Sequence, residues 1–127
     1  DPRHMACSDG IYLGDHPHPR GWAAFARFLG RHTRDLGDWT WGQAARHLAG
    51  HAAERFSLAG RGIVSRGNVA DLAIVDPGTV ADRATYASPR DLATGVTHVV
   101  VGGEVVLDDG RLTGAAPGRG LRRGEMT

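Results

Sequence analysis

The sequence has little cysteine, little net charge and no long apolar run, and each shortage narrows what the protein can be. Cys7 is the only cysteine among 127 residues, so no disulfide can form within the chain. Fifteen basic and fourteen acidic side chains leave a formal net charge of +1, which gives no strong field for nucleic acid or an anionic membrane. No apolar run approaches the ~20 residues that span a bilayer. We therefore expect neither a nucleic-acid partner nor a membrane partner.

An export signal is also missing from the first thirty residues, which hold no charged start followed by a long apolar stretch. Together with the single cysteine, this predicts a cytoplasmic location. The chain opens on DPRHMACSDG without any lead-in element before its first apolar run. That opening indicates either a scar left by purification or a cut into a longer protein.

The sequence does contain enough apolar material for one modest core, because 41% of its residues are hydrophobic. Residues 5–8 predict the end of a buried strand, which the turn-forming pair Asp9-Gly10 stops. After a loop with two His-Pro pairs, apolar residues near helical spacing predict a helix over 21–36. Gly37 follows at the position where a glycine commonly ends a helix.

The next part of the chain predicts two more helices. Thr40, followed three residues later by Gln43, forms a capping box. It predicts a helix over 41–49 that Gly50 ends. A third, short helix is expected over about 52–56.

After residue 58 the chain changes character, because β-branched residues gather and glycines recur. Strands are predicted at DLAIVD (71–76), VTHVVV (96–101) and EVVL (104–107). The pairs Gly102-Gly103 and Asp109-Gly110 predict hairpin turns between strands. The expected organisation is helices first and strands second, with two domains at 1–58 and 59–127.

Several longer motifs resemble one family. SDG followed by HPR, ADLAIVDP followed by TVADRATY, and the closing DGRLTGAAPGR are similar to the N-acyl-D-amino-acid deacylases, the D-aminoacylase branch of the amidohydrolase superfamily. The resemblance runs from about residue 5 to residue 122 and concerns the C-terminal third of these enzymes. It implies a zinc-dependent hydrolase built as a (β/α)8 barrel with a small β-sandwich.

This resemblance gives the fold class that we expect, an α+β segment of that larger architecture. Residues 5–8 correspond to the last barrel strand, and residues 21–56 correspond to helices that follow it. Residues 68–113 correspond to strands of the β-sandwich. A complete barrel needs roughly 200 residues or more, so this chain can hold only part of one.

Asp9 occupies the position of the family's catalytic aspartate. Without the resemblance, an Asp-Gly pair after a strand would most often be an ordinary turn; with it, Asp9 is expected to be the general base of amide hydrolysis and a possible zinc ligand. Barrel active sites in general lie at the C-terminal ends of the strands, which agrees with this position. His18 and Arg20 belong to the matching HPR motif and are expected to border the substrate pocket. The other zinc ligands of the family have no counterpart here, so we do not expect this segment alone to hold zinc.

Two other histidine pairs have metal-like spacings and simpler interpretations. His16 and His18 show the H-x-H spacing that suits two ligands on one strand, but the flanking prolines place them in a loop. His47 and His51 lie four residues apart and could share a helical face. Because Gly50 lies between them and is expected to end the helix, we predict a surface pair instead.

The remaining candidates are predicted to be structural. Cys7 is expected to be a small core residue, although it alternates with Asp9 along the predicted strand. His98 is expected to be a residue of the β-sandwich. Four large side chains at helical spacing are expected to be core and not a ligand-binding box: Trp22, Phe25, Phe28 and Leu29.

The sequence thus predicts the terminal segment of an enzyme that hydrolyses N-acyl-D-amino acids, or related linear amides, to a carboxylate and a free amino acid. The rest of the barrel chain is its expected partner, and the segment alone is expected to be inactive. The alternative is a non-catalytic α+β module derived from the same fold, which binds partners or self-associates. Such a module would use the strand edges that a missing sandwich partner leaves exposed.

Overall fold

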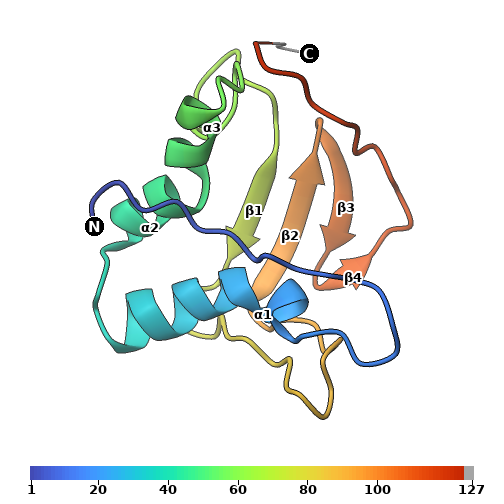
Figure 1. Ribbon diagram of the computed structural model, residues 1–127. Helices are drawn as coiled ribbons and strands as arrows, with labels where there is room; N and C mark the ends of the chain where they lie inside the picture. Colours follow the sequence, from blue (N-terminus) through green and yellow to red (C-terminus); the bar gives the residue numbers. More distant parts are fainter. Residues whose placement is uncertain (125–127) are drawn as a thin grey trace.

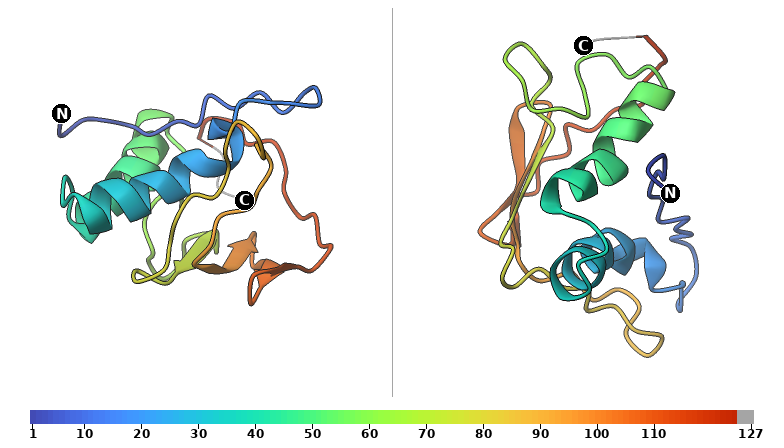
Figure 2. Two further views of the ribbon diagram at one scale, coloured as in Figure 1. Left: turned by 90° about the horizontal axis from the view of Figure 1, so that it is seen from below. Right: turned by 90° about the vertical axis from the view of Figure 1, so that its left-hand side faces the viewer.

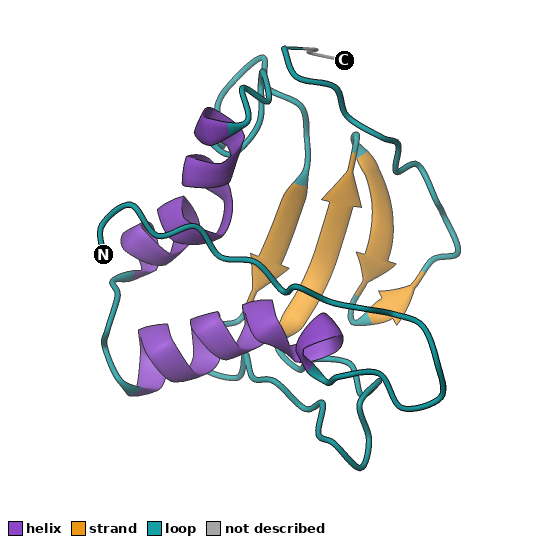
Figure 3. Cartoon of the chain, in the orientation of Figure 1, coloured by secondary structure: helices purple, strands orange, loops and turns teal. Residues whose placement is uncertain are grey.

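Helices of the first half of the chain lie to one side of a small sheet formed by the second half (Figure 1). The structure is a computed structural model and describes residues 1–124. Seen from two further directions, the helices lie between the N-terminal segment and the sheet (Figure 2). The predicted order of helices first and strands second is confirmed (Figure 3). No helix among the described residues is both long and apolar enough to cross a membrane.

The first helical stretch comprises α1 (Arg20–Arg27) and the π-helical segment η1 (Phe28–Asp35), which continue into one another. Together they cover nearly the range predicted for one helix. The Thr33 hydroxyl donates a hydrogen bond of 3.0 Å to the Phe28 carbonyl, across the wider π-helical turn. Gly37, at φ +65°, follows the last helical residue, which confirms its predicted role.

The buried face of this stretch carries small residues. Its buried members are Ala23, Ala26, Gly30 and Thr33. A Cβ atom added to Gly30 would lie 2.5 Å from the Val80 carbonyl oxygen. The helix therefore packs directly on the backbone of the second half of the chain, and a larger side chain has no room there.

The prediction that four large side chains of this stretch form the core is consequently wrong. Phe25 is 43% exposed, and the other three, Trp22, Phe28 and Leu29, are only half-buried. The close approach at Gly30 selects small side chains for the inner face, so the large ones lie at its margins. The Phe28 ring stacks on Trp39 there, with 5.4 Å between ring centroids.

The second helical stretch consists of α2 (Trp41–Ala45), the π-helical segment η2 (Arg46–Gly50) and α3 (His51–Arg55). The capping box is confirmed at its start. The Gln43 N–H donates to the Thr40 hydroxyl oxygen at 3.2 Å, and the Thr40 N–H donates to Oε1 of Gln43 at 2.8 Å.

The prediction that Gly50 ends a helix is wrong. Gly50 has the helical angles φ −58° and ψ −51°, so the two predicted helices form one continuous stretch. An added Cβ atom at Gly50 would lie 3.5 Å from the Gly62 carbonyl oxygen, so this glycine meets the chain that follows at close range. The stretch instead ends near Phe56, and Ser57 has the left-handed φ of +54°.

The sheet has four antiparallel strands in chain order. They are β1 (Leu72–Val75), β2 (Val96–Val101), β3 (Glu104–Asp108) and β4 (Arg111–Leu112). The three predicted strands are confirmed, and the short β4 adds a fourth that the pattern did not predict. Both hairpin turns are confirmed: Gly102 and Gly103 have φ +58° and +87°, and Asp109 and Gly110 have φ +45° and +73°. Two successive positive φ angles are typical of the type I′ turn.

The predicted strand over residues 5–8 is not formed among the described residues. This segment is extended, and the Ala6 N–H donates to the His47 carbonyl of the second helical stretch at 2.9 Å. A strand exists only when a neighbouring strand pairs with it. The segment crosses the helices and not the sheet (Figure 2). The division into domains at residue 58 stays a prediction.

Candidate active site

Asp9 lies in the N-terminal segment, before the chain bends at residues 14–16 and enters the first helical stretch at Arg20. Its backbone has the left-handed φ of +46°, and its side chain is 80% exposed. A Cβ atom added to Gly10 would lie 2.9 Å from Gly21 Cα, so the chain can pass this point only with a glycine. The turn predicted at Asp9-Gly10 is not formed, because the chain has neither a turn nor a bend at these residues and next bends at residues 14–16.

Arg20 holds Asp9 through two contacts. Its Nε donates to the Asp9 carbonyl oxygen at 2.8 Å, and its Nη2 lies 2.9 Å from Oδ2 of the carboxylate. One guanidinium thus fixes both the backbone and the side chain of Asp9. The contact leaves N–H groups of Arg20 for another acceptor, since a guanidinium carries five.

His18 stands next to this pair and connects it to the second half of the chain. Its Nδ1 accepts a hydrogen bond of 3.1 Å from the Arg20 backbone N–H. Its Nε2 lies 3.0 Å from the Tyr86 hydroxyl, and the two rings meet edge to face with 5.2 Å between centroids. The structure therefore brings together all three residues that the sequence assigned to the site.

A hollow of about 600 Å³ lies over these residues. One wall comes from Asp9, His18, Arg20 and the first helical stretch, and a second wall comes from Asp82, Ala84, Thr85 and Tyr86. Arg27 joins the two walls through an ion pair of 3.0 Å with Asp82. Because both halves of the chain line the hollow, it exists only when helices and sheet are assembled.

The sequence analysis missed the contribution of the second half to this hollow. Arg27, Asp82 and Tyr86 all line it. Asp82 and Tyr86 belong to TVADRATY, one of the motifs that carry the family resemblance. That motif was the sequence signal that could have pointed to these residues, although no local pattern in it predicts that they lie near Asp9.

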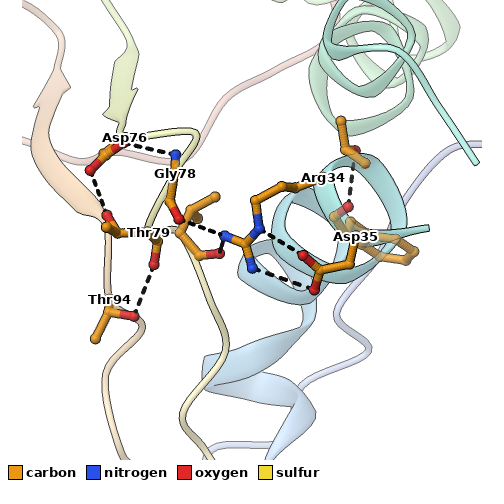
Figure 4. Close-up of polar contacts among 9 residues, drawn as sticks. Arg34, Asp35, Asp76, Gly78, Thr79 and Thr94 are labelled. Atoms are coloured by element: carbon orange, nitrogen blue, oxygen red, sulfur yellow. Dashed lines mark hydrogen bonds and ion pairs between the residues drawn. The ribbon is translucent and has the colours of Figure 1, made fainter. Parts of the chain in front are cut away.

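A polar network holds this second wall against the helices (Figure 4). Arg34 of η1 donates to the Val80 carbonyl at 2.8 Å and pairs with Asp35 at 2.7 Å. On the other side, the carboxylate of Asp76 accepts from the Thr79 hydroxyl at 2.7 Å and from the Gly78 N–H at 2.8 Å. These two hydrogen bonds, the Thr79 one foremost, hold the pKa of Asp76 below its ordinary value. These hydrogen bonds stiffen the turn over 76–79, which lies just before the second wall at residues 82–86.

The prediction of a surface pair at His47 and His51 is wrong for His47, which is buried. Both rings bond through Nδ1 to the His4 carbonyl oxygen, at 2.8 Å and 3.1 Å. The helix continues through Gly50, so both rings point to one side and fasten the N-terminal segment. Burial, and secondarily His47, lower the pKa of His4 in this cluster.

Two further predictions concern residues outside the site. Cys7 is exposed and not a core residue, because no strand packs around its segment within the described residues. It lines the hollow next to Asp9. His16 lies exposed in the loop, as expected. His98 lies in β2, and its Nε2 is 3.1 Å from Asp108 of β3, which agrees with a structural role in the sheet.

Metal binding was tested against the residues present. Among residues 1–124, no three His, Cys, Asp or Glu side chains come close enough together to hold a metal ion. Catalytic zinc usually takes three protein ligands. The exposed carboxylate of Asp9 therefore does not fit a zinc site by itself.

Known proteins resemble this chain over most of its length. The D-aminoacylase of Alcaligenes xylosoxydans xylosoxydans is 44% identical over 119 residues, which are 94% of this chain and 25% of that enzyme. Solved structures of D-aminoacylase, one of them a study of its binuclear metal centre, match with a TM-score of 0.90 and the same identity and coverage. The N-acyl-D-glutamate deacylase of Bordetella bronchiseptica, solved with zinc and a phosphonate mimic of the tetrahedral intermediate, matches with a TM-score of 0.82. It is 39% identical over 88% of this chain and 24% of its own.

The chain thus spans about a quarter of the length of the relatives it matches. The sequence model of the amidohydrolase family matches residues 8–107, which include Asp9, the helices and most of the sheet. With this match and the relatives' identity, the resemblance seen in the sequence motifs is confirmed. The chain belongs to the amidohydrolase family.

Proposed function

We propose that the chain is part of a hydrolase that cleaves the amide bond of N-acyl-D-amino acids into a carboxylate and a free amino acid. The observation that carries this proposal is the exposed Asp9 carboxylate at a hollow, in a chain that is 44% identical to a D-aminoacylase. Because the chain covers a quarter of that relative, the activity belongs to a longer protein. In that protein, residues 5–8 would pair as a barrel strand and β1–β4 would join a β-sandwich.

Asp9 is the proposed general base. Amide hydrolysis requires that a water lose a proton as it attacks the carbonyl carbon and that the departing amine gain one. The carboxylate takes the first proton and delivers the second, so one residue serves both steps. Its exposure gives it access to the substrate, and the contacts with Arg20 fix its direction.

Zinc is the proposed cofactor, since the Bordetella relative was solved with it. Bound zinc would acidify the attacking water and polarise the carbonyl. Asp9 could supply one ligand. The described residues do not complete the set, so the other ligands must come from the rest of the longer protein.

Arg20 and His18 are proposed to form the substrate-binding side of the hollow, Arg20 by direct contact with the substrate and His18 by its bond to Arg20. The α-carboxylate of an N-acyl amino acid carries a full negative charge, and a guanidinium is a suitable donor for it. The N–H groups of Arg20 that Asp9 leaves free could reach this carboxylate in the hollow. His18 stands beside them, bonded to the Arg20 backbone.

The test uses a chimeric enzyme in which this chain replaces the matching quarter of the Alcaligenes D-aminoacylase. We expect the chimera to release D-methionine from N-acetyl-D-methionine in the presence of zinc. Asp9→Asn should reduce kcat by about 10²- to 10⁴-fold, the usual contribution of a general base. Asp109→Asn, which changes a carboxylate in a distant hairpin turn and suits its left-handed backbone, is the matched control.

An Asp9→Asn chimera that retains the parent's kcat while Asp109→Asn behaves identically would refute the proposed base. The 127-residue chain alone should show no turnover above a buffer blank with zinc present. Turnover by that chain would show that the missing three quarters are not needed.

A further inference from the structure

The contact between His18 and Tyr86 determines where the protons of both side chains lie. Nδ1 of His18 accepts from the Arg20 backbone N–H, so this nitrogen carries a lone pair. A neutral imidazole with a lone pair on Nδ1 has its proton on Nε2. The Nε2–H group therefore donates to the Tyr86 hydroxyl oxygen, 3.0 Å away.

This assignment leaves the Tyr86 hydroxyl with an unused donor. The oxygen accepts from His18, so the O–H proton points to some other acceptor. Tyr86 is 76% exposed, and both it and His18 line the hollow that contains Asp9. The free donor thus lies in the same hollow as Asp9, on a ring that His18 holds in place.

The free donor of Tyr86 does not stand alone. Arg20 lies on the other side of His18 and retains N–H groups that Asp9 does not use. The His18 imidazole bonds the Tyr86 hydroxyl at 3.0 Å and the Arg20 backbone N–H at 3.1 Å, so it holds the Tyr86 ring next to the residue that carries the guanidinium. A carboxylate has two oxygens that can accept from two such donors at once, and it binds charged and neutral donors more strongly than an amide carbonyl does.

We propose that Tyr86 is a substrate-binding residue whose hydroxyl, oriented by His18, donates a hydrogen bond to the carboxylate of the N-acyl amino acid beside Arg20. His18 acts in this as a positioning residue. The inference rests on the proposed function and adds to it a residue from the second half of the chain. The network of Arg34 and Asp76 holds that half in place (Figure 4).

The experiment compares Tyr86→Phe with the parent in the chimeric enzyme. This variant keeps the ring and removes only the hydroxyl. We expect KM for N-acetyl-D-methionine to rise about 10- to 100-fold, the effect of losing a hydrogen bond to a charged group, while kcat changes less than about twofold. The inhibition constant of N-acetyl-D-methioninamide, which lacks the carboxylate, should not change.

Three outcomes would overturn the inference. They are an unchanged KM for N-acetyl-D-methionine, an equal rise in the inhibition constant of N-acetyl-D-methioninamide, or a fall in kcat without any rise in KM. For His18, the His18→Gln change should raise KM in the parent and add nothing in the Tyr86→Phe background. Additive losses would instead show that His18 contacts the substrate independently.

The design separates this inference from the proposed function. If the parent chimera shows turnover that depends on Asp9 and Tyr86→Phe has no effect, only the inference fails. If the parent shows no turnover that depends on Asp9, the proposed function fails first.

Discussion

The sheet and the site segment, which we define as residues 4–20, are held in place by different means. Strands β1 to β4 follow one another in the chain and pair with their sequence neighbours. The site segment instead depends on residues 43 to 76 positions away: His47 contacts the His4 carbonyl, Tyr86 contacts His18 and Arg90 donates to the Gly14 carbonyl.

This difference indicates which part of the chain a loss of tertiary contacts would disturb first. A hairpin forms from a strand pattern and a turn, which are properties of adjacent residues. The position of Asp9 follows from the assembly of helices, loop and sheet. Changes that loosen this assembly should therefore disturb the site segment before they disturb the strands, and three predictions test that order.

Gly30→Val should have the largest effect. An added Cβ atom would lie 2.5 Å from the Val80 carbonyl oxygen, so the first helical stretch and the second wall must move apart. We expect a loss of about 1–3 kcal/mol in the free energy of unfolding, as for other overpacked sites. Amide hydrogen exchange should speed up in the site segment and change little in β2 and β3.

Gly42→Ala is the matched control for this prediction. Gly42 lies in α2, and no atom would lie within 4 Å of an added Cβ. Alanine is the better helix former by about 1 kcal/mol, so stability should stay equal or rise. Equal exchange rates in the parent and in Gly30→Val would contradict the proposed contact between helix and loop.

Thr40→Ala should have a smaller effect, of about 1 kcal/mol, because it removes a capping side chain. The capping box starts the helical stretch that carries His47 and His51 to the His4 carbonyl. Urea unfolding should show the loss, and Thr40→Ser, which keeps the hydroxyl, should largely restore stability. A full loss in the serine variant would mean that the threonine methyl group matters and not the cap.

The smallest effect is expected for the part of the pH dependence of stability that His4 contributes. Its folded-state pKa lies below the ordinary 6.5, so the unfolded chain takes up the proton more readily. This contribution to stability is present above about pH 6.5 and is lost as the pH falls below it. His47, the N-terminal amine and His51 face His4 and contribute to lowering its pKa.

Replacing His4 isolates its share of this dependence. In His4→Leu, the thermal midpoint should fall less between pH 7.5 and pH 5.5 than it does in the parent. The residual fall reports the other titrating groups. An identical fall in both proteins would show that His4 does not contribute.

Sequence reasoning succeeded where neighbouring residues decide the structure. Thr40 and Gln43 predicted a capping box because both partners lie within one turn, and Gly102-Gly103 predicted a hairpin because both residues must adopt positive φ. It failed at Gly50, which has helical backbone angles although a glycine at such a place commonly ends a helix. It also failed for residues 5–8, whose pattern describes a strand but cannot supply its neighbours.

The residues of the candidate site also differ in whether neighbouring sequence could reveal them. Asp9, His18 and Arg20 were identified from short motifs, and the structure brings them together. Tyr86 was missed, because it lies 68 positions from His18 and no local pattern indicates that the two rings meet.

The sequence by itself determined the order of helices and strands and the hairpin turns, and its motifs named Asp9 as the candidate carboxylate. Only the tertiary structure decided that small residues form the inner helix face, that His47 is buried and that Tyr86 lines the same hollow as Asp9. The physical reason is how far apart in the chain the interacting residues lie. Backbone turns and caps depend on atoms a few residues apart, whereas burial and the meeting of two walls depend on how distant segments fill the same space.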